Sequence, residues 1–148
     1  MATATNLGTI YTAGLNNVGT YQVSGVPFAT GSVDCSNTTK IEFPYVTRWI
    51  MVSNNGTTPV SVGFSRAGVE VNAQLAAGDI GENYFVLGKP SATDVAVATP
   101  RMELKLTELW VSGSSNVSVM AGLTNLPIAR VNNISTSGTN WSGSVGVG

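Results

Sequence analysis

The chain has 148 residues and a formal net charge of −1, set by seven basic and eight acidic side chains. So few cations cannot form the basic surface that a phosphate backbone requires, which argues against nucleic-acid binding. The chain contains no histidine, which excludes Ser-His-Asp and Cys-His catalytic groups and His-ligated zinc. A single domain of this length buries roughly 70% of the surface that its unfolded chain exposes, so it needs no metal or disulfide to hold a core.

Residues 1–31 are predicted to form an extended N-terminal arm. The opening residues MATATNLGTIYTAG have neither a cationic segment nor a continuous apolar run, so no secretory signal is expected. Glycines and small polar residues then separate single apolar anchors, among them Tyr11, Tyr21 and Phe28, with a short strand expected at 20–24. A partly disordered leader is the alternative, but spaced aromatic anchors favour an arm that binds a partner.

Residues 32–131 are predicted to form a β-sandwich domain, because short alternating segments follow one another between turns. Residues 40–43 alternate and stop at a proline, which cannot donate to a strand ladder. Residues 47–53 contain a continuous Trp-Ile-Met-Val run that includes Trp49 and Met51. This run predicts a strand buried on both faces, or one with a face in the core and a face in a subunit contact.

Two hairpins are expected in this domain. The sequence Asn-Asn-Gly-Thr at 54–57 predicts a tight turn into an alternating strand at 60–65. Residues 101–121 predict a second hairpin, in which the alternation slips by one residue near Thr107 and the chain turns at 113–116.

Between the hairpins, a short helical turn is expected at 73–77, a strand at 84–87 and an edge strand at 94–98. About eight short strands with glycine, asparagine and proline turns favour an all-β, antiparallel two-sheet sandwich, in particular a jelly roll. An immunoglobulin-like sandwich is the alternative, weakened by the missing pair of cysteines. No apolar run approaches the ~20 residues of a membrane span, so no membrane contact is expected.

Residues 132–148 are rich in Gly, Ser, Asn and Thr and are predicted to form a flexible C-terminal tail. The tail carries one large side chain, Trp141. A lone tryptophan in such a segment predicts a docking anchor, with an accident of composition as the alternative.

Few residues offer chemistry. Cys35 is a single thiol without an activating histidine and is interpreted as a small filler at a strand edge. The carboxylate pairs Glu103 with Glu108 and Asp79 with Glu82 could in principle serve a glycosidase or a calcium site, but no calcium-loop motif accompanies them. No enzymatic activity, cofactor or metal is therefore expected.

Three segments resemble small virion structural proteins of tailed bacteriophages, notably those that infect cyanobacteria. They are GLNNVGTYQVSGVPFATG at 14–31, IEFPYVTRWIMVSNNG, and LWVSGSSNVSVMAGLTNLP near the end of the sandwich. In that group an arm of the form GLxxVGxYxVSGxPF precedes a β-sandwich whose later segment has the form ELWVSG…VAGLTNLP. The similarity covers residues 14–130 and implies a capsid decoration (cement) protein or another small virion component.

The resemblance implies a protein on the outer surface of the capsid that binds the major capsid protein and itself, a trimer being favoured. A phage fibre or head-surface module that binds host carbohydrate is the alternative, with Trp49, Trp110 or Trp141 stacking on a sugar. The predicted partner-binding residues are Tyr11, Tyr21, Phe28, Trp49, Met51 and Trp141.

Overall fold

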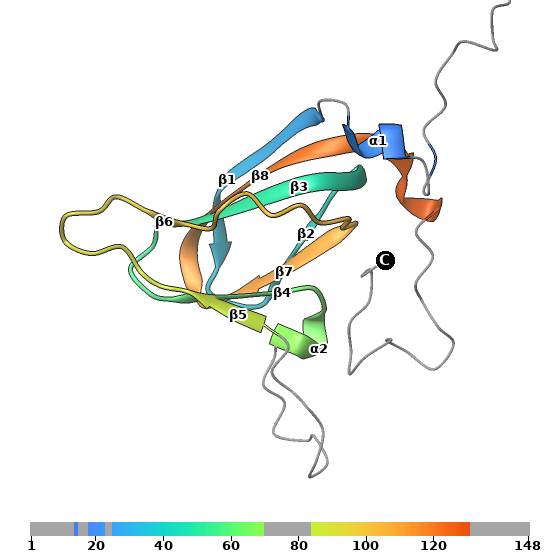
Figure 1. Ribbon diagram of the computed structural model, residues 1–148. Coiled ribbons are helices and arrows are strands. Elements are labelled where there is room, and N and C mark those ends of the chain that lie inside the picture. Colours follow the sequence, from blue (N-terminus) through green and yellow to red (C-terminus); the bar gives the residue numbers. More distant parts are fainter. Residues whose placement is uncertain (1–13, 15–17, 23–24, 70–83, 131–148) are drawn as a thin grey trace, which may run out of the picture.

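The computed structural model describes residues 14, 18–22, 25–69 and 84–130 (Figure 1). The strands in this part are β1 (Val26–Cys35), β2 (Thr39–Glu42), β3 (Tyr45–Asn54), β4 (Val60–Gly63), β5 (Tyr84–Leu87), β6 (Val97–Ala98), β7 (Glu108–Ser112) and β8 (Ser114–Pro127). Two short helices, α1 (Val18–Gln22) and α2 (Arg66–Val69), and the 3₁₀ helix η2 (Ile128–Arg130) accompany them. One sheet has the strand order β1-β8-β3-β6 and the other the order β2-β7-β4-β5.

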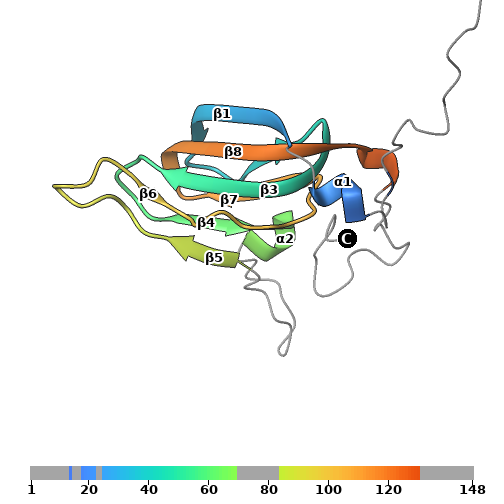
Figure 2. The ribbon, with the colours of Figure 1, turned by 45° about the horizontal axis from the view of Figure 1, so that its top comes forward.

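The two antiparallel sheets lie face to face, with β1, β8 and β3 in one layer and β7, β4 and β5 in the other (Figure 2). Because successive residues of a strand point to opposite faces, alternate side chains fill the space between the layers. Those that are at most 1% exposed include Ile50, Val52, Val60, Val62, Leu109, Val111, Val117 and Val119. The predicted all-β sandwich is confirmed.

Several strands lie where the sequence predicted them. β5 coincides with the strand expected at 84–87, and β2 and β3 cover most of those expected at 40–43 and 47–53. Only Val97 and Ala98 of the segment 94–98 form a strand, β6, which lies at an edge of the first sheet as expected.

The predicted hairpin at 101–121 is wrong. β7 pairs with β2 and β4 of the second sheet, whereas β8 pairs with β1 and β3 of the first. The turn between them therefore crosses from one sheet to the other. Gly113 makes this turn with a φ of 113°, which favours glycine. Its N–H donates to the carbonyl of Cys35 (2.7 Å), and its carbonyl accepts from the hydroxyl of Thr58 (2.5 Å).

Charged and apolar residues alternate at 101–106, but this segment does not form a strand. They belong to a strap, residues 99–107, that runs beside β3 and then reaches the second sheet. Met102 pairs with Ile50 as an isolated bridge, and the hydroxyl of Thr47 bonds to the carbonyl of Leu104 (2.6 Å) and the N–H of Leu106 (2.8 Å). Alternate strap side chains still face the core, which explains the strand-like pattern.

The turn at 54–57 also joins different sheets, because β3 lies in the first and β4 in the second. The side chain of Asn54, which is fully buried, closes it. Its Oδ1 accepts from the N–H of Gly56 (3.0 Å) and the hydroxyl of Ser114 (2.7 Å), and its Nδ2 donates to the carbonyls of Thr58 (2.8 Å) and Gly88 (2.9 Å). Asn54 thus ties three connections together at one end of the sandwich.

The expected boundary of the arm at residue 31 falls inside β1 and is corrected to a position before Val26. Phe28 is a core residue, because its ring meets that of Phe43 edge to face at 5.1 Å and packs against the buried cluster. The short strand expected at 20–24 is also wrong, since Val18–Gln22 form a single helical turn, α1. The helical turn expected at 73–77 lies outside the described residues.

We expect deletion of residues 1–13 to leave a folded sandwich and deletion of residues 1–31 to unfold it. The longer deletion removes six of the ten residues of β1, among them the partly buried Phe28, and the loss of a fully buried Phe side chain alone costs about 3–5 kcal/mol. Thermal unfolding followed by circular dichroism of both truncated chains measures the difference. An unchanged melting temperature for the 1–31 deletion would contradict the placement of β1 in the core.

Candidate protein-interaction surface

The outer face of the first sheet, the side turned away from the second sheet, is largely apolar. Because Ile50 and Val52 point inward, the neighbouring residues of β3, Trp49 and Met51, point outward. The register places Met120 of β8 between Met51 on one side and Ala29 of β1 on the other. Met120 is 50% exposed. Three strands far apart in the sequence therefore contribute one apolar row.

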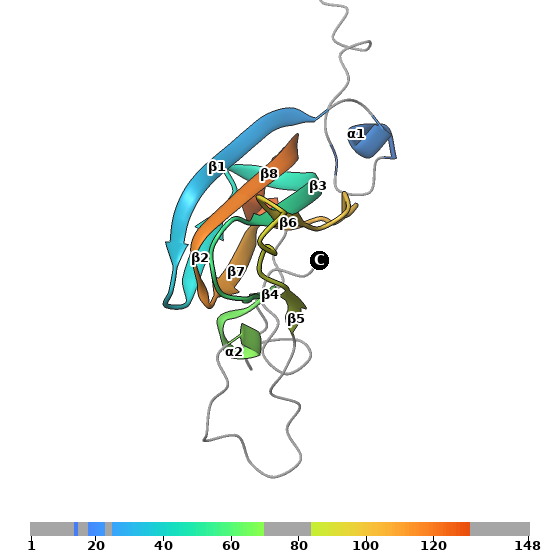
Figure 3. The ribbon, with the colours of Figure 1, turned by 90° about the vertical axis from the view of Figure 1, so that its left-hand side faces the viewer.

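A groove crosses this outer face next to the methionines. Its lining contains no charged side chain and consists of Ala29, Thr30, Gly31, Met51, Val52, Ser53, Ala98, Ser118, Val119 and Met120. We call it the apolar groove. β1 bends along its length beside it (Figure 3), with its pairing to β8 shifted between Thr30 and Val33 and with Ser32 at a φ of 55°. Such irregularities increase the local curvature of an edge strand.

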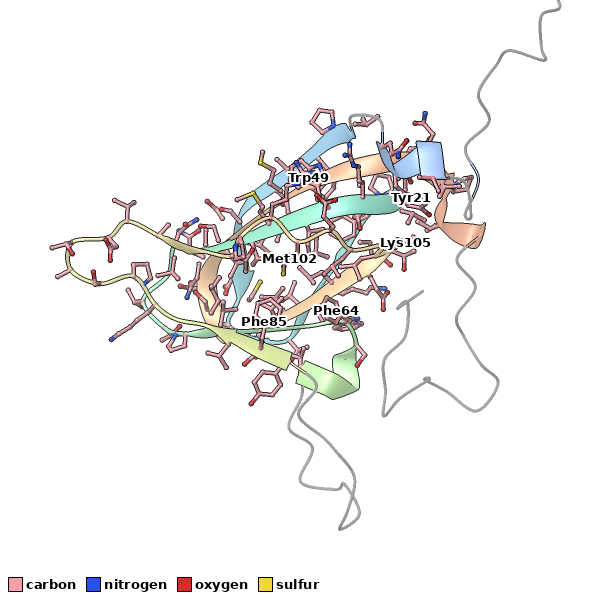
Figure 4. The ribbon with its side chains drawn as sticks, in the orientation of Figure 1. Tyr21, Trp49, Phe64, Phe85, Met102 and Lys105 are labelled. Atoms are coloured by element: carbon pink, nitrogen blue, oxygen red, sulfur yellow. The ribbon has the colours of Figure 1, made fainter. Side chains whose placement is uncertain are left out.

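Trp49 lies flat against the sheet one row away from the methionines. Gly122 stands directly opposite it on β8, and a Cβ at Gly122 would lie 2.6 Å from Cε2 of the indole. The guanidinium of Arg101 lies over the same ring at 5.4 Å and is paired with Glu103. The strap and the sheet thus hold Trp49 (Figure 4), and much of its ring is already in contact with the protein.

The outer face of the second sheet has a different character. Trp110 of β7 donates its indole N–H to Glu108 (3.0 Å), and the ammonium of Lys40 on β2 lies 5.9 Å from the ring centre. Lys40 also bonds to Glu42 (2.6 Å) and lies 3.9 Å from Glu108. The hydrogen bond to Glu42 raises the pKa of Lys40. This is a charged cluster on the surface, whereas the first sheet offers apolar side chains.

The sequence-predicted site residues fall into three groups. Trp49 and Met51 lie on the outer face of the first sheet, as the apolar run at 47–53 suggested. Phe28 packs against the core. The ammonium of Lys105 lies 4.5 Å from the ring centre of Tyr21 of α1, and Figure 4 shows the two side chains close together. Tyr11 and Trp141 lie outside the described residues. Met120 and Ala29 were not predicted as site residues. The alternation in β8 already indicates that Met120 points to the opposite face of the sheet from its buried neighbours Val119 and Ala121.

In the described part of the chain, the carboxylates that were considered for a glycosidase or calcium site do not lie together. Glu103 pairs with Arg101, and Glu108 bonds to Trp110, while the pair Asp79 and Glu82 lies outside it. No group of three or more Cys, Asp or Glu side chains that could hold a metal occurs among the described residues.

No protein-family model, curated protein or solved structure matches the chain. Within the described ranges, none of the helices is long and apolar enough to cross a membrane. The outer face of the first sheet therefore has to be interpreted from its own chemistry.

Cys35 is the last residue of β1 and is fully buried, in agreement with its interpretation as a small filler. Burial raises the pKa of its thiol, and the nearby Asp34 carboxylate adds to the increase. The thiol therefore ionises more readily in the unfolded chain than in the folded one. Its contribution to the free energy of unfolding is present below the unfolded pKa of ~8.5 and decreases as the pH rises above it.

We expect Cys35 to react with a thiol reagent at least ~100-fold more slowly in the native protein than in guanidinium chloride, because the thiolate is the reactive form and the native thiol is both buried and protonated. Absorbance after addition of an aromatic disulfide at pH 7.5 measures both rates. Rapid native reaction would show that the thiol is accessible.

Proposed function

We propose that the protein is a non-enzymatic structural component of a tailed-phage virion, a decoration or cement protein. In this function it binds the major capsid protein on the outer surface of the head and stabilises the head. The resemblance of residues 14–130 to small virion proteins supports the proposal, as do the fold and the outer face of the first sheet.

We also propose that the sandwich is a jelly roll. In the described part β1 pairs with β8, β2 with β7, β3 with β6, and β4 with β5. Such nested pairing is expected when one long antiparallel ribbon is folded over into two sheets, as in a jelly roll. Jelly rolls are common in viral capsid proteins, although the fold alone does not define a function.

The observation that carries the proposal is the apolar outer face of the first sheet. Met120 is half exposed beside Met51 and Ala29, and the neighbouring groove has no charged lining residue. Contiguous exposed apolar surface of this kind is typical of protein–protein contacts, and methionine is enriched in them. A permanently assembled particle provides a partner that keeps such a face covered.

The same face supports self-association. A two-sheet sandwich buries one side of each sheet, so Met51 and Met120 remain available to another chain. Closed cyclic symmetry is the usual arrangement of identical copies. The family resemblance favours a trimer.

Carbohydrate recognition finds less support. A sugar-binding tryptophan needs a free ring face, but Trp49 is held between Gly122 and Arg101. Trp110 is engaged by Glu108 and Lys40. Both rings serve the fold of their own chain.

The proposal is tested by quantifying the protein in purified virions. We expect a copy number comparable to that of the major capsid protein and, in cryo-electron microscopy, regular density on the outside of the head. Absence from virions, or a few copies confined to the tail, would overturn the proposal. Tail-fibre location together with binding to host polysaccharide would favour the recognition module.

A further inference from the structure

The apolar groove has a volume of about 330 Å³ and a lining that suits one large apolar side chain. Ser53 and Ser118 lie opposite each other across β3 and β8, with Ala98 and Gly31 on the flanking strands. These small residues leave room beside Met51 and Met120, which border them. Thioether sulfurs also make favourable contacts with aromatic rings.

The chain provides a matching segment beyond Arg130. Residues 131–148 contain no Asp, Glu, Lys or Arg, and Trp141 is the one aromatic residue among them. Because neither the segment nor the groove lining carries a charged side chain, docking of the segment would bury no unpaired charge. The segment follows β8, the strand that carries Met120 and Ser118.

The direction of the chain argues that the segment reaches a neighbouring copy. From Met120 to Arg130 the chain runs along β8 and η2, a path of at most ~30 Å at the usual rise per residue. The stretch from Arg130 to Trp141 spans at most ~40 Å when fully extended. Returning to its own groove would require a reversal, and the ~4 residues of a turn leave less than ~30 Å of extended chain.

We propose that Trp141 of one copy inserts into the apolar groove of a neighbouring copy, between Met51 and Met120. This contact covers the half-exposed Met120 and links copies head to tail, an arrangement that closes into a ring when the rotation permits. The inference rests on the self-association in the proposed function and is independent of capsid binding.

The test is disulfide cross-linking between two single variants of the full chain. Ser118→Cys places a thiol in the groove, and Ser142→Cys places one beside Trp141. The two variants are made with different masses, so that the mixed dimer is distinguished from dimers of a single variant. Cys35 is fully buried and does not compete. The matched control replaces the groove variant by Ala92→Cys, at an exposed position in the connection between β5 and β6. A chain that carries both Ser118→Cys and Ser142→Cys reports docking within one copy.

We expect the mixed dimer of Ser118→Cys and Ser142→Cys to form at least ~10-fold faster than the dimer with Ala92→Cys. Equal rates, or an internal disulfide in a monomeric double variant, would overturn the inference. Sedimentation of the same wild-type chain separates the two proposals: an oligomer without the cross-link contradicts the groove assignment alone, whereas a monomer contradicts the proposed self-association as well.

Substitution of the docking side chain gives a second readout. Trp141→Ala should weaken self-association about 10-fold or more, and Trp141→Phe should retain most of it because an aromatic ring still fills the groove. Val145→Ala, in the same segment, is the matched control and should change the dissociation constant less than ~2-fold. An unchanged constant for Trp141→Ala would contradict the inference even if every variant folds.

Discussion

Replacement of Asn54 by alanine is expected to lower the free energy of unfolding by about 3 kcal/mol or more. The side chain is fully buried and makes four hydrogen bonds. Its removal leaves the N–H of Gly56, the hydroxyl of Ser114 and the carbonyls of Thr58 and Gly88 without that partner. Each buried polar group that loses its hydrogen bond costs about 1–3 kcal/mol, and the members of one network depend on each other.

Urea unfolding measured by tryptophan fluorescence provides the test, with Asn55→Ala as the matched control. The Asn55 side chain bonds to the hydroxyls of Ser53 and Ser118 in a partly buried position, so its loss should cost less than about 1.5 kcal/mol. Equal losses for the two variants would contradict the role of Asn54 in joining the three connections.

Replacement of Met120 by glutamate is expected to abolish assembly without unfolding the chain. Met120 is half exposed in the single chain, where a carboxylate can remain hydrated. In an assembled contact the same carboxylate would be buried without a partner, and the cost of an unpaired buried charge predicts at least ~100-fold weaker association. Sedimentation velocity and co-sedimentation with heads that lack the protein measure self-association and particle binding.

The matched control is Val86→Glu, because Val86 is 60% exposed on β5 of the second sheet. This variant should oligomerise and bind particles as the wild type does. If Met120→Glu assembles normally, the outer face of the first sheet is not the contact. If Val86→Glu alone fails, the contact lies on the second sheet.

Much of the fold could be predicted because strand alternation reports which side chains are buried. The segment that became β2 was identified in this way, whereas those that became β3 and β5 were identified from uninterrupted apolar runs. Alternation does not report which sheet a strand joins, and this is why two sheet-crossing turns were interpreted as hairpins. The decisive interactions come from elsewhere in the chain: Gly113 bonds to Cys35 and Thr58, and Asn54 bonds to Gly88 and Ser114.

The candidate surface could be predicted only where its residues are neighbours in the sequence. Trp49 and Met51 were found because an uninterrupted apolar run implies two covered faces. Met120 and Ala29 stand alone in β8 and β1, and only the register of the first sheet brings them beside Met51. Phe28 was assigned to the arm because glycines surround it, but its contact with Phe43 places it in the core.

Oxidative footprinting of purified particles tests most directly whether the outer face of the first sheet is the assembly surface. Hydroxyl radicals convert exposed methionines to sulfoxides, and mass spectrometry quantifies Met51 and Met120 on the head and in the free protein after dilution to the monomer. We predict at least ~5-fold protection of Met120, with parallel protection of Met51, while Tyr84 of the second sheet changes less than ~2-fold. Equal oxidation of Met120 on and off the particle would contradict the account.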